Sequence, residues 1–174
     1  MPAEQEVAGS TPARRTTTSL QADFQTLFGT KENLQLAAVA AAGERFADAV
    51  VRPARGAHAG AARLRALLER WIVYAETPLF AGGCFWAANL VDFDSRPGPV
   101  RDALLEHHRA WLALIARELR HAVDAGEIAD LDIDLAAFQI DAVLVATNTA
   151  LRLGDPGAVS RARQVIEGLL TPPR

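Results

Sequence analysis

The chain has 174 residues, of which 50% are apolar and 22% are charged, and its formal net charge is −3. This length suits one domain with its own core, and the composition is too apolar for a disordered protein. The single cysteine, Cys84, excludes an intramolecular disulfide framework and a cysteine-based zinc site, and the small negative charge excludes a polycation that binds nucleic acid through charge alone.

Residues with high helix propensity dominate the chain and predict an all-α fold. There are 35 alanines and 17 arginines, while aromatic residues make up only 6%. No alternation of apolar and polar residues predicts a strand. Residues 1–18 lack the apolar run of a signal peptide, and no apolar stretch is long enough to span a bilayer. We therefore expect a cytoplasmic protein that begins with a loose tail.

Apolar residues recur at helical spacing through the rest of the chain, and their patterns place the helix boundaries. We expect Thr30 to be an N-cap, Pro53 to end the helix before it, Gly126 to be a left-handed C-cap and Asp134 to be an N-cap. The predicted helices cover about 20–28, 31–52, 57–76, 82–93, 100–126, 135–152 and 156–170.

The last two predicted helices carry more apolar surface than one small bundle needs. Helix 135–152 is apolar almost all round, and a tight turn at 154–156 leads into an amphipathic helix. Such an antiparallel pair can form a four-helix interface in a two-fold dimer, and the alternative is a helix buried inside a monomer. The expected interface residues are Phe138, Asp141, Val145, Asn148, Val159, Ala162 and Ile166.

Most of the aromatic residues fall in three of the predicted helices and favour a pocket for a small hydrophobic or aromatic molecule. For each ring alone, core packing is the alternative. His108 lies on an apolar face, where it is either a hydrogen-bonded core histidine, a polar anchor for a ligand or a metal ligand. The expected ligand-binding residues are Trp71, Tyr74, Trp86, Asn89, Phe93, His108 and Trp111.

Catalytic motifs are absent from the sequence. There is no glycine-rich phosphate loop, no Ser-x-x-Lys and no pair of carboxylates in an obvious cleft. Cys84 has no basic neighbour that would lower its pKa, so we expect it to be a buried, inert thiol. We predict neither an enzyme nor a bound metal or cofactor.

Three segments resemble the tetracycline-repressor (TetR/AcrR) family of transcriptional regulators. Residues 27–34, LFGTKENL, are similar to the end of the family's recognition helix and the start of its linking helix. Residues 83–88 and 93–101 resemble the mid-domain signature of one branch, and residues 150–156 resemble the junction of the two dimerisation helices. The resemblance covers about 20–170.

The resemblance implies a homodimer in which a ligand bound to the helical C-terminal domain alters the spacing of two helix-turn-helix heads and releases DNA. It assigns residues 1–30 to a tail with a truncated or degenerate head, and residues 31–174 to a ligand-binding and dimerisation domain. Gln25, Thr26 and Lys31 match the family's phosphate-contacting region.

Two functions remain open at this point. One is a ligand-responsive repressor that binds DNA as a homodimer. The other is a small-molecule-binding dimer without DNA binding of its own, which titrates full-length relatives by forming mixed dimers. Residues 1–31 have a net charge of zero, whereas a DNA-binding head is normally basic. The charged residues of this segment are Arg14, Arg15 and Lys31 against Glu4, Glu6 and Asp23.

Overall fold

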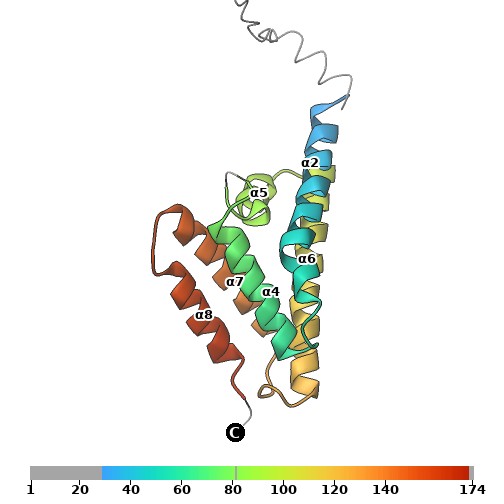
Figure 1. Ribbon diagram of the computed structural model, residues 1–174. Helices are drawn as coiled ribbons and strands as arrows, with labels where there is room; N and C mark the ends of the chain where they lie inside the picture. Colours follow the sequence, from blue (N-terminus) through green and yellow to red (C-terminus); the bar gives the residue numbers. More distant parts are fainter. Residues whose placement is uncertain (1–28, 81, 173–174) are drawn as a thin grey trace, which may run out of the picture.

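The computed structural model describes residues 29–80 and 82–172 (Figure 1). Within these two ranges every regular element is a helix, which confirms the predicted all-α class. The short helix expected at about 20–28 lies outside the described residues. The elements are α2 (Lys31–Phe46), the π-helical turn η1 (Ala47–Val51), α3 (Arg52–Ala54), α4 (Ala61–Glu76), α5 (Phe85–Phe93), α6 (Pro99–Asp124), α7 (Ile133–Arg152) and α8 (Ala158–Leu169).

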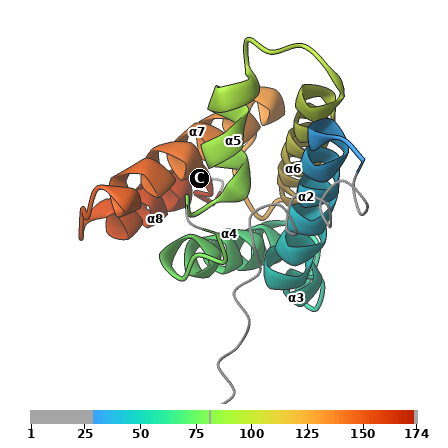
Figure 2. The same ribbon diagram turned by 90° about the horizontal axis from the view of Figure 1, so that it is seen from above.

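The helices form a bundle with two paired edges. Helices α2 and α6 run side by side, α7 and α8 form an antiparallel pair, and the two pairs meet where α7 packs on α6, with α4 packed against both of these helices (Figures 1 and 2). The short helix α5 packs against α6 above one end of α4. None of the helices described is both long enough and apolar enough to cross a membrane.

Helix α2 begins as predicted but does not end before Pro53. Thr30 is the N-cap, since its Oγ1 accepts the backbone N–H of Asn33 at 3.1 Å. The helical path then continues through η1 and α3, so the predicted stop at Pro53 is wrong. A proline ring crowds the carbonyl four residues earlier. In the wider π turn the amide of Arg52 bonds to the carbonyl of Ala47, five residues back, which makes room for the ring.

The predicted cap at the end of α6 is confirmed, whereas the cap predicted at the start of α7 is wrong. Gly126 follows α6 with a φ of 67°, as expected for a left-handed residue after a helix. At the start of α7 the cap is Asp132, whose carboxylate accepts the N–H of Leu135 at 3.0 Å. The prediction of Asp134 is corrected: it lies inside the first turn of α7, because the helix begins earlier than its apolar pattern indicated.

The apolar stripes of α4 and α6 form much of the core. In α6 only His108 and Val123 of the stripe are partly exposed, and the stripe is Val100, Leu104, His108, Trp111, Ile115, Leu119 and Val123. In α4 the stripe is fully buried. The buried residues of α4 on this stripe are Leu64, Leu67, Leu68, Trp71, Ile72 and Ala75.

Two carboxylates hold the start of α4 against the end of α6. The buried side chain of Glu118 accepts the N–H of Gly60 at 3.1 Å, and Glu127 accepts the N–H of Ala61 at 2.7 Å. The two amides lie at the N-terminus of α4 and have no acceptor within that helix. The helix dipole also favours negative charge at this end. Burial by itself would raise the pKa of Glu118, but hydrogen bonds from Arg117 and Gly60 and the charges of Arg117 and Arg63 hold it below its ordinary value.

We expect Glu118→Gln to lower the free energy of unfolding by about 2 kcal/mol at neutral pH, because a charge-assisted hydrogen bond is lost in the core. Since folding depresses the pKa of Glu118, its contribution is present above the unfolded-state pKa of about 4.3. It is lost as the pH falls through the lower folded-state pKa, and the variant should lack that part of the acid sensitivity. Urea unfolding across this pH range measures both effects.

The matched control is Glu167→Gln, which removes an exposed ion pair with Arg65. We expect it to cost less than about 1 kcal/mol. Equal losses for the two variants would contradict the role given to Glu118.

Candidate ligand-binding site

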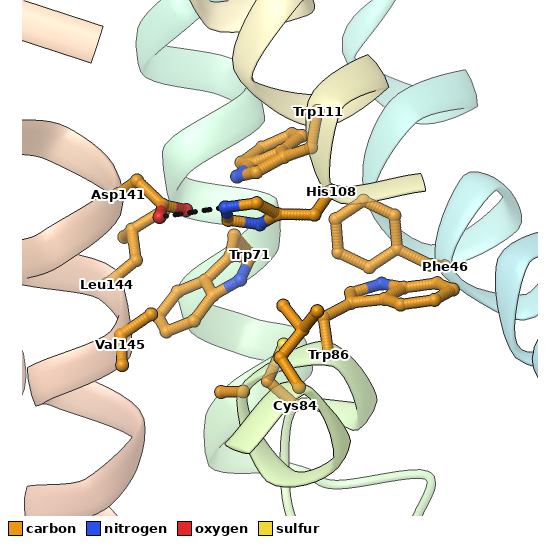
Figure 3. Close-up of a pocket in the computed structure, with 11 residues that line it drawn as sticks. Phe46, Trp71, Cys84, Trp86, His108, Trp111, Asp141, Leu144 and Val145 are labelled. Atoms are coloured by element: carbon orange, nitrogen blue, oxygen red, sulfur yellow. Dashed lines mark ion pairs between the residues drawn. The ribbon is translucent and has the colours of Figure 1, made fainter. Parts of the chain in front are cut away.

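A cavity lies inside the bundle where side chains from α2, α4, α5, α6 and α7 meet (Figure 3). Its volume is about 30 Å³, which leaves room for about one or two water molecules. The walls are aromatic and aliphatic except for a histidine, an aspartate and a cysteine. We call it the His108 cavity, and it is lined by Phe46, Trp71, Cys84, Trp86, Ala87, Leu90, His108, Trp111, Asp141, Leu144 and Val145.

An ion pair crosses the His108 cavity from α6 to α7. The ring of His108 points toward Asp141, with Nε2 and Oδ2 3.5 Å apart (Figure 3). This separation is longer than an ordinary N–H···O hydrogen bond, and within the described residues no other group bonds to Asp141. Burial raises the pKa of Asp141, and the charge of His108 opposes that shift. The carboxylate is therefore only partly satisfied by the protein.

Phe46 joins the walls of the cavity to one another. Its ring meets those of Tyr74, Trp86 and Trp111 edge-on, at centroid distances of 5.4, 6.4 and 5.3 Å. Such T-shaped contacts align the positive edge of one ring with the negative face of another. The four rings come from α4, α5, α6 and the last residue of α2, so this ring cluster, three members of which line the cavity, also ties these helices together.

Side chains from α4 and α7 set the position of α5, which has no capping side chain of its own. Asn148 Oδ1 accepts the N–H of Cys84 at 2.8 Å, and Tyr74 Oη accepts the N–H of Phe85 at 3.2 Å. Burial raises the pKa of Tyr74 to about 12, so its hydroxyl stays protonated at neutral pH. These bonds fix the start of α5 and thereby the place of Trp86 in the cavity wall.

A larger hollow with a volume of about 450 Å³ opens between α2 and α6, and we call it the α2–α6 groove. Three rings, those of Phe46, Trp86 and Trp111, line both hollows and form the wall between them. On the groove side the ring of His107 stacks on Trp86 with a centroid distance of 4.8 Å. The groove is lined by Ala40, Gly43, Glu44, Phe46, Ala47, Val51, Trp86, His107, Ala110, Trp111 and Leu114.

The structure brings four of the seven expected ligand-binding residues together: Trp71, Trp86, His108 and Trp111 all line the His108 cavity. The other three lie elsewhere. Tyr74 packs behind Phe46 and supports α5. Asn89 and Phe93 line a separate hollow between α2, α5 and α6, and the amide of Asn89 is already bonded to the carbonyl of Phe85 at 2.8 Å.

Several residues that line the cavity are absent from the expected ligand-binding set. Asp141 and Val145 belong to the expected dimer interface, and Phe46 and Leu144 carry no expected role in a site. A lone acidic residue in an apolar helix indicates that the carboxylate has a polar partner. The position of Asp141 in the helical pattern does not distinguish His108 of the same chain from a residue of a second chain as that partner.

Four of the expected interface residues lie inside the subunit. Val159, Ala162 and Ile166 are buried because α8 turns its apolar stripe toward α4 and α7, and Asn148 of α7 is buried where it accepts the N–H of Cys84. Phe138 and Val145 remain exposed, by 68% and 40%. The exposed large apolar residues of α7, its C-cap and α8, a set that we call the α7–α8 face, are Leu135, Phe138, Val145, Leu153 and Val165.

The expected DNA contacts fall at the edge of the structure. Gln25 and Thr26 lie outside the described residues, and Lys31 is the exposed first residue of α2. In the described part of the chain, no group of three or more histidine, cysteine, aspartate or glutamate side chains could hold a metal ion.

Comparisons with known proteins agree with this architecture. A solved structure of AibR in complex with isovaleryl coenzyme A and operator DNA has the same fold, with a TM-score of 0.70 at 16% sequence identity, over 87% of this chain and 81% of the AibR chain. No curated protein sequence matches the chain. Residues 60–166 match the family model described as "Tetracyclin repressor-like, C-terminal domain", which spans more than half of the sequence. The chain therefore belongs to the TetR family of regulators through this domain.

Proposed function

We propose that this chain is a ligand-responsive transcriptional repressor that acts as a homodimer and binds its effector in the His108 cavity. One observation carries the proposal: a partly satisfied His108–Asp141 pair lies inside an aromatic cavity whose wall includes the last residue of α2. A cavity with apolar walls and a few convergent polar groups is the usual form of a small-molecule site.

The small volume of the His108 cavity supports a link between ligand binding and α2. A ligand larger than a few atoms has to part the rings of Phe46, Trp86 and Trp111, because they separate the cavity from the α2–α6 groove. Displacement of Phe46 moves the end of α2, and residues 1–30, which resemble the remnant of a DNA-binding head, precede that helix. Binding would thereby reach the segment that contacts DNA.

The π-helical turn η1 lies directly after Phe46 and provides a point at which the path of α2 can change. Such turns occur often at functional sites. Arg52 bridges it from the far side, pairing with Asp48 and, at 2.7 Å, with Glu44 of α2. Because all three side chains are substantially exposed, these ion pairs hold the turn only weakly.

The α7–α8 face supports dimerisation with a second copy of the chain. Leu135, Phe138 and Val145 follow one another at spacings of three and seven residues along α7, so they share one side of the helix. A row of exposed large apolar side chains on two adjacent helices is typical of an isologous interface. The proposed interface therefore keeps Phe138 and Val145 and adds Leu135, Leu153 and Val165.

The AibR structure includes operator DNA, which supports DNA as the partner of this chain as well. The neutral charge of residues 1–31 favours a second candidate function, in which the dimer binds the small molecule but not DNA and acts by forming mixed dimers with full-length relatives.

Ala87→Phe should block ligand binding, because Ala87 lines the narrow His108 cavity and the added ring would fill it. We expect small aromatic compounds that raise the melting temperature of the wild-type protein to leave that of this variant unchanged. Val91→Phe is the matched control, since Val91 lies on the same helix but is exposed. A thermal-shift screen measures both, and an equal ligand response in the two variants would argue against the site.

Phe138→Glu should convert the dimer to a monomer by placing a charge in the apolar α7–α8 face. Val91→Glu, which changes an equally exposed side chain on α5, should leave the mass at that of a dimer. Light scattering gives the mass of each variant in solution. A dimer that survives the Phe138 substitution would refute this interface.

A fluorescence-anisotropy titration with duplex DNA distinguishes the two candidate functions. For the repressor we expect binding at low salt that weakens by at least about tenfold as the salt concentration rises a few-fold, because phosphate contacts release counterions. An effector found in the thermal-shift screen should also weaken it. If the chain fails to bind any duplex at low salt, the repressor is excluded and the second candidate stands.

A further inference from the structure

Within the described ranges, the aspartate and the glutamate that line the two hollows are not accompanied there by a basic lysine or arginine side chain. Asp141 faces the His108 cavity and Glu44 lies at the α2–α6 groove, and in the part of the chain that the structure describes, no lysine or arginine lines either hollow. Glu44 is already paired with Arg52 at 2.7 Å outside the groove. Asp141 is thus the acidic group of the described lining that faces the His108 cavity, where its half-buried carboxylate has only His108 beside it as a cationic partner.

The other polar groups of the cavity do not neutralise Asp141 permanently. His108 is the nearest, but it is neutral unless protonated and is 3.5 Å away. Burial raises the pKa of the Cys84 thiol, which keeps it uncharged at neutral pH. A ligand group that donates hydrogen bonds and carries positive charge would complete the coordination of the carboxylate.

The aromatic walls favour the same kind of ligand. The faces of tryptophan and phenylalanine rings are negative and attract cations, most strongly in the case of tryptophan. Trp71, Trp86 and Trp111 line the His108 cavity together with Phe46. An anion would meet these ring faces and the carboxylate without any fixed positive charge to hold it.

We propose that the His108 cavity takes an apolar organic cation, with an ammonium group between Asp141 and the tryptophan rings and an aromatic or aliphatic body that extends toward the α2–α6 groove. This inference rests on the proposed ligand site and specifies its chemistry. It also separates this chain from AibR, whose bound isovaleryl coenzyme A carries phosphates. Phosphates call for basic side chains, which the lining of these hollows does not supply.

The chain provides its own reporter for a test. All three of its tryptophans line the His108 cavity, and Trp86 and Trp111 also line the α2–α6 groove, so intrinsic tryptophan fluorescence reports on these two adjoining hollows. Three probes share a phenyl body and differ in the charge of the head group: 2-phenylethylammonium, 2-phenylethanol and 3-phenylpropanoate. Isovaleryl coenzyme A serves as a fourth probe.

We expect 2-phenylethylammonium to bind the wild-type protein on the order of tenfold tighter than the alcohol, with 3-phenylpropanoate and isovaleryl coenzyme A weaker still. Asp141→Asn, which preserves shape and removes charge, should reduce the affinity for the ammonium probe to that for the alcohol. Asp92→Asn, an exposed change on α5, should preserve the tenfold preference.

Each contrary result has a separate meaning. Tighter binding of the alcohol, the carboxylate or the coenzyme A ester overturns the cation inference and leaves the proposed ligand site intact. A preference for the ammonium probe that persists in Asp141→Asn overturns the role of the carboxylate. If no probe changes the fluorescence of the wild-type protein and no compound in the thermal-shift screen raises its melting temperature, the cation inference and the proposed function fail together. The comparison of probes on the wild-type protein stands even if the variant does not fold.

Discussion

The contact on which this structure depends most is the cluster of rings around Phe46. The last residue of α2 meets one ring each from α4, α5 and α6, all edge-on and with centroids within 6.4 Å. Each such pair contributes about 0.5–1.5 kcal/mol beyond the area it buries. Because Phe46 contacts each of the other three rings, a displacement of Phe46 alters all three contacts. Phe46, Trp86 and Trp111 of this cluster line the His108 cavity, so the packing that joins the helices also connects the cavity to α2.

Among the polar side chains inside the bundle, buried Glu118 and Asn148 hold helices together, whereas half-buried Asp141 faces the His108 cavity. Glu118 accepts hydrogen bonds from Gly60 and Arg117, and Asn148 holds the loop before α5 through Cys84 and Gly82. Polar groups in a core cost free energy unless they are paired, so these interactions fix the positions of α4 and α5. Asp141 differs, since among the described residues its one ion-pair partner is a histidine at 3.5 Å. That difference is why the His108 cavity, rather than the sites of Glu118 and Asn148, is proposed to hold a ligand.

Sequence patterns located the helices well where the deciding chemistry was local. Thr30 and Gly126 were assigned correctly because a cap depends on a few neighbouring residues. Pro53 misled the prediction, since the π turn before it removes the clash that normally ends a helix. The stripe of α8, which the sequence analysis places at a dimer interface, packs on the chain's own α4 and α7, and the outward side of α7 carries exposed apolar residues.

The sequence by itself determined the all-helical class, the approximate position of each described helix and the gathering of Trp71, Trp86, Trp111 and His108 on buried or half-buried faces. Only the tertiary structure decided that Asp141 faces His108 and that Phe46 closes the cavity. The physical reason is that helical periodicity shows which side of a helix is covered but not by what. The hydrophobic effect is non-directional, so the packing of all the helices together determines which surface covers the apolar face of each helix.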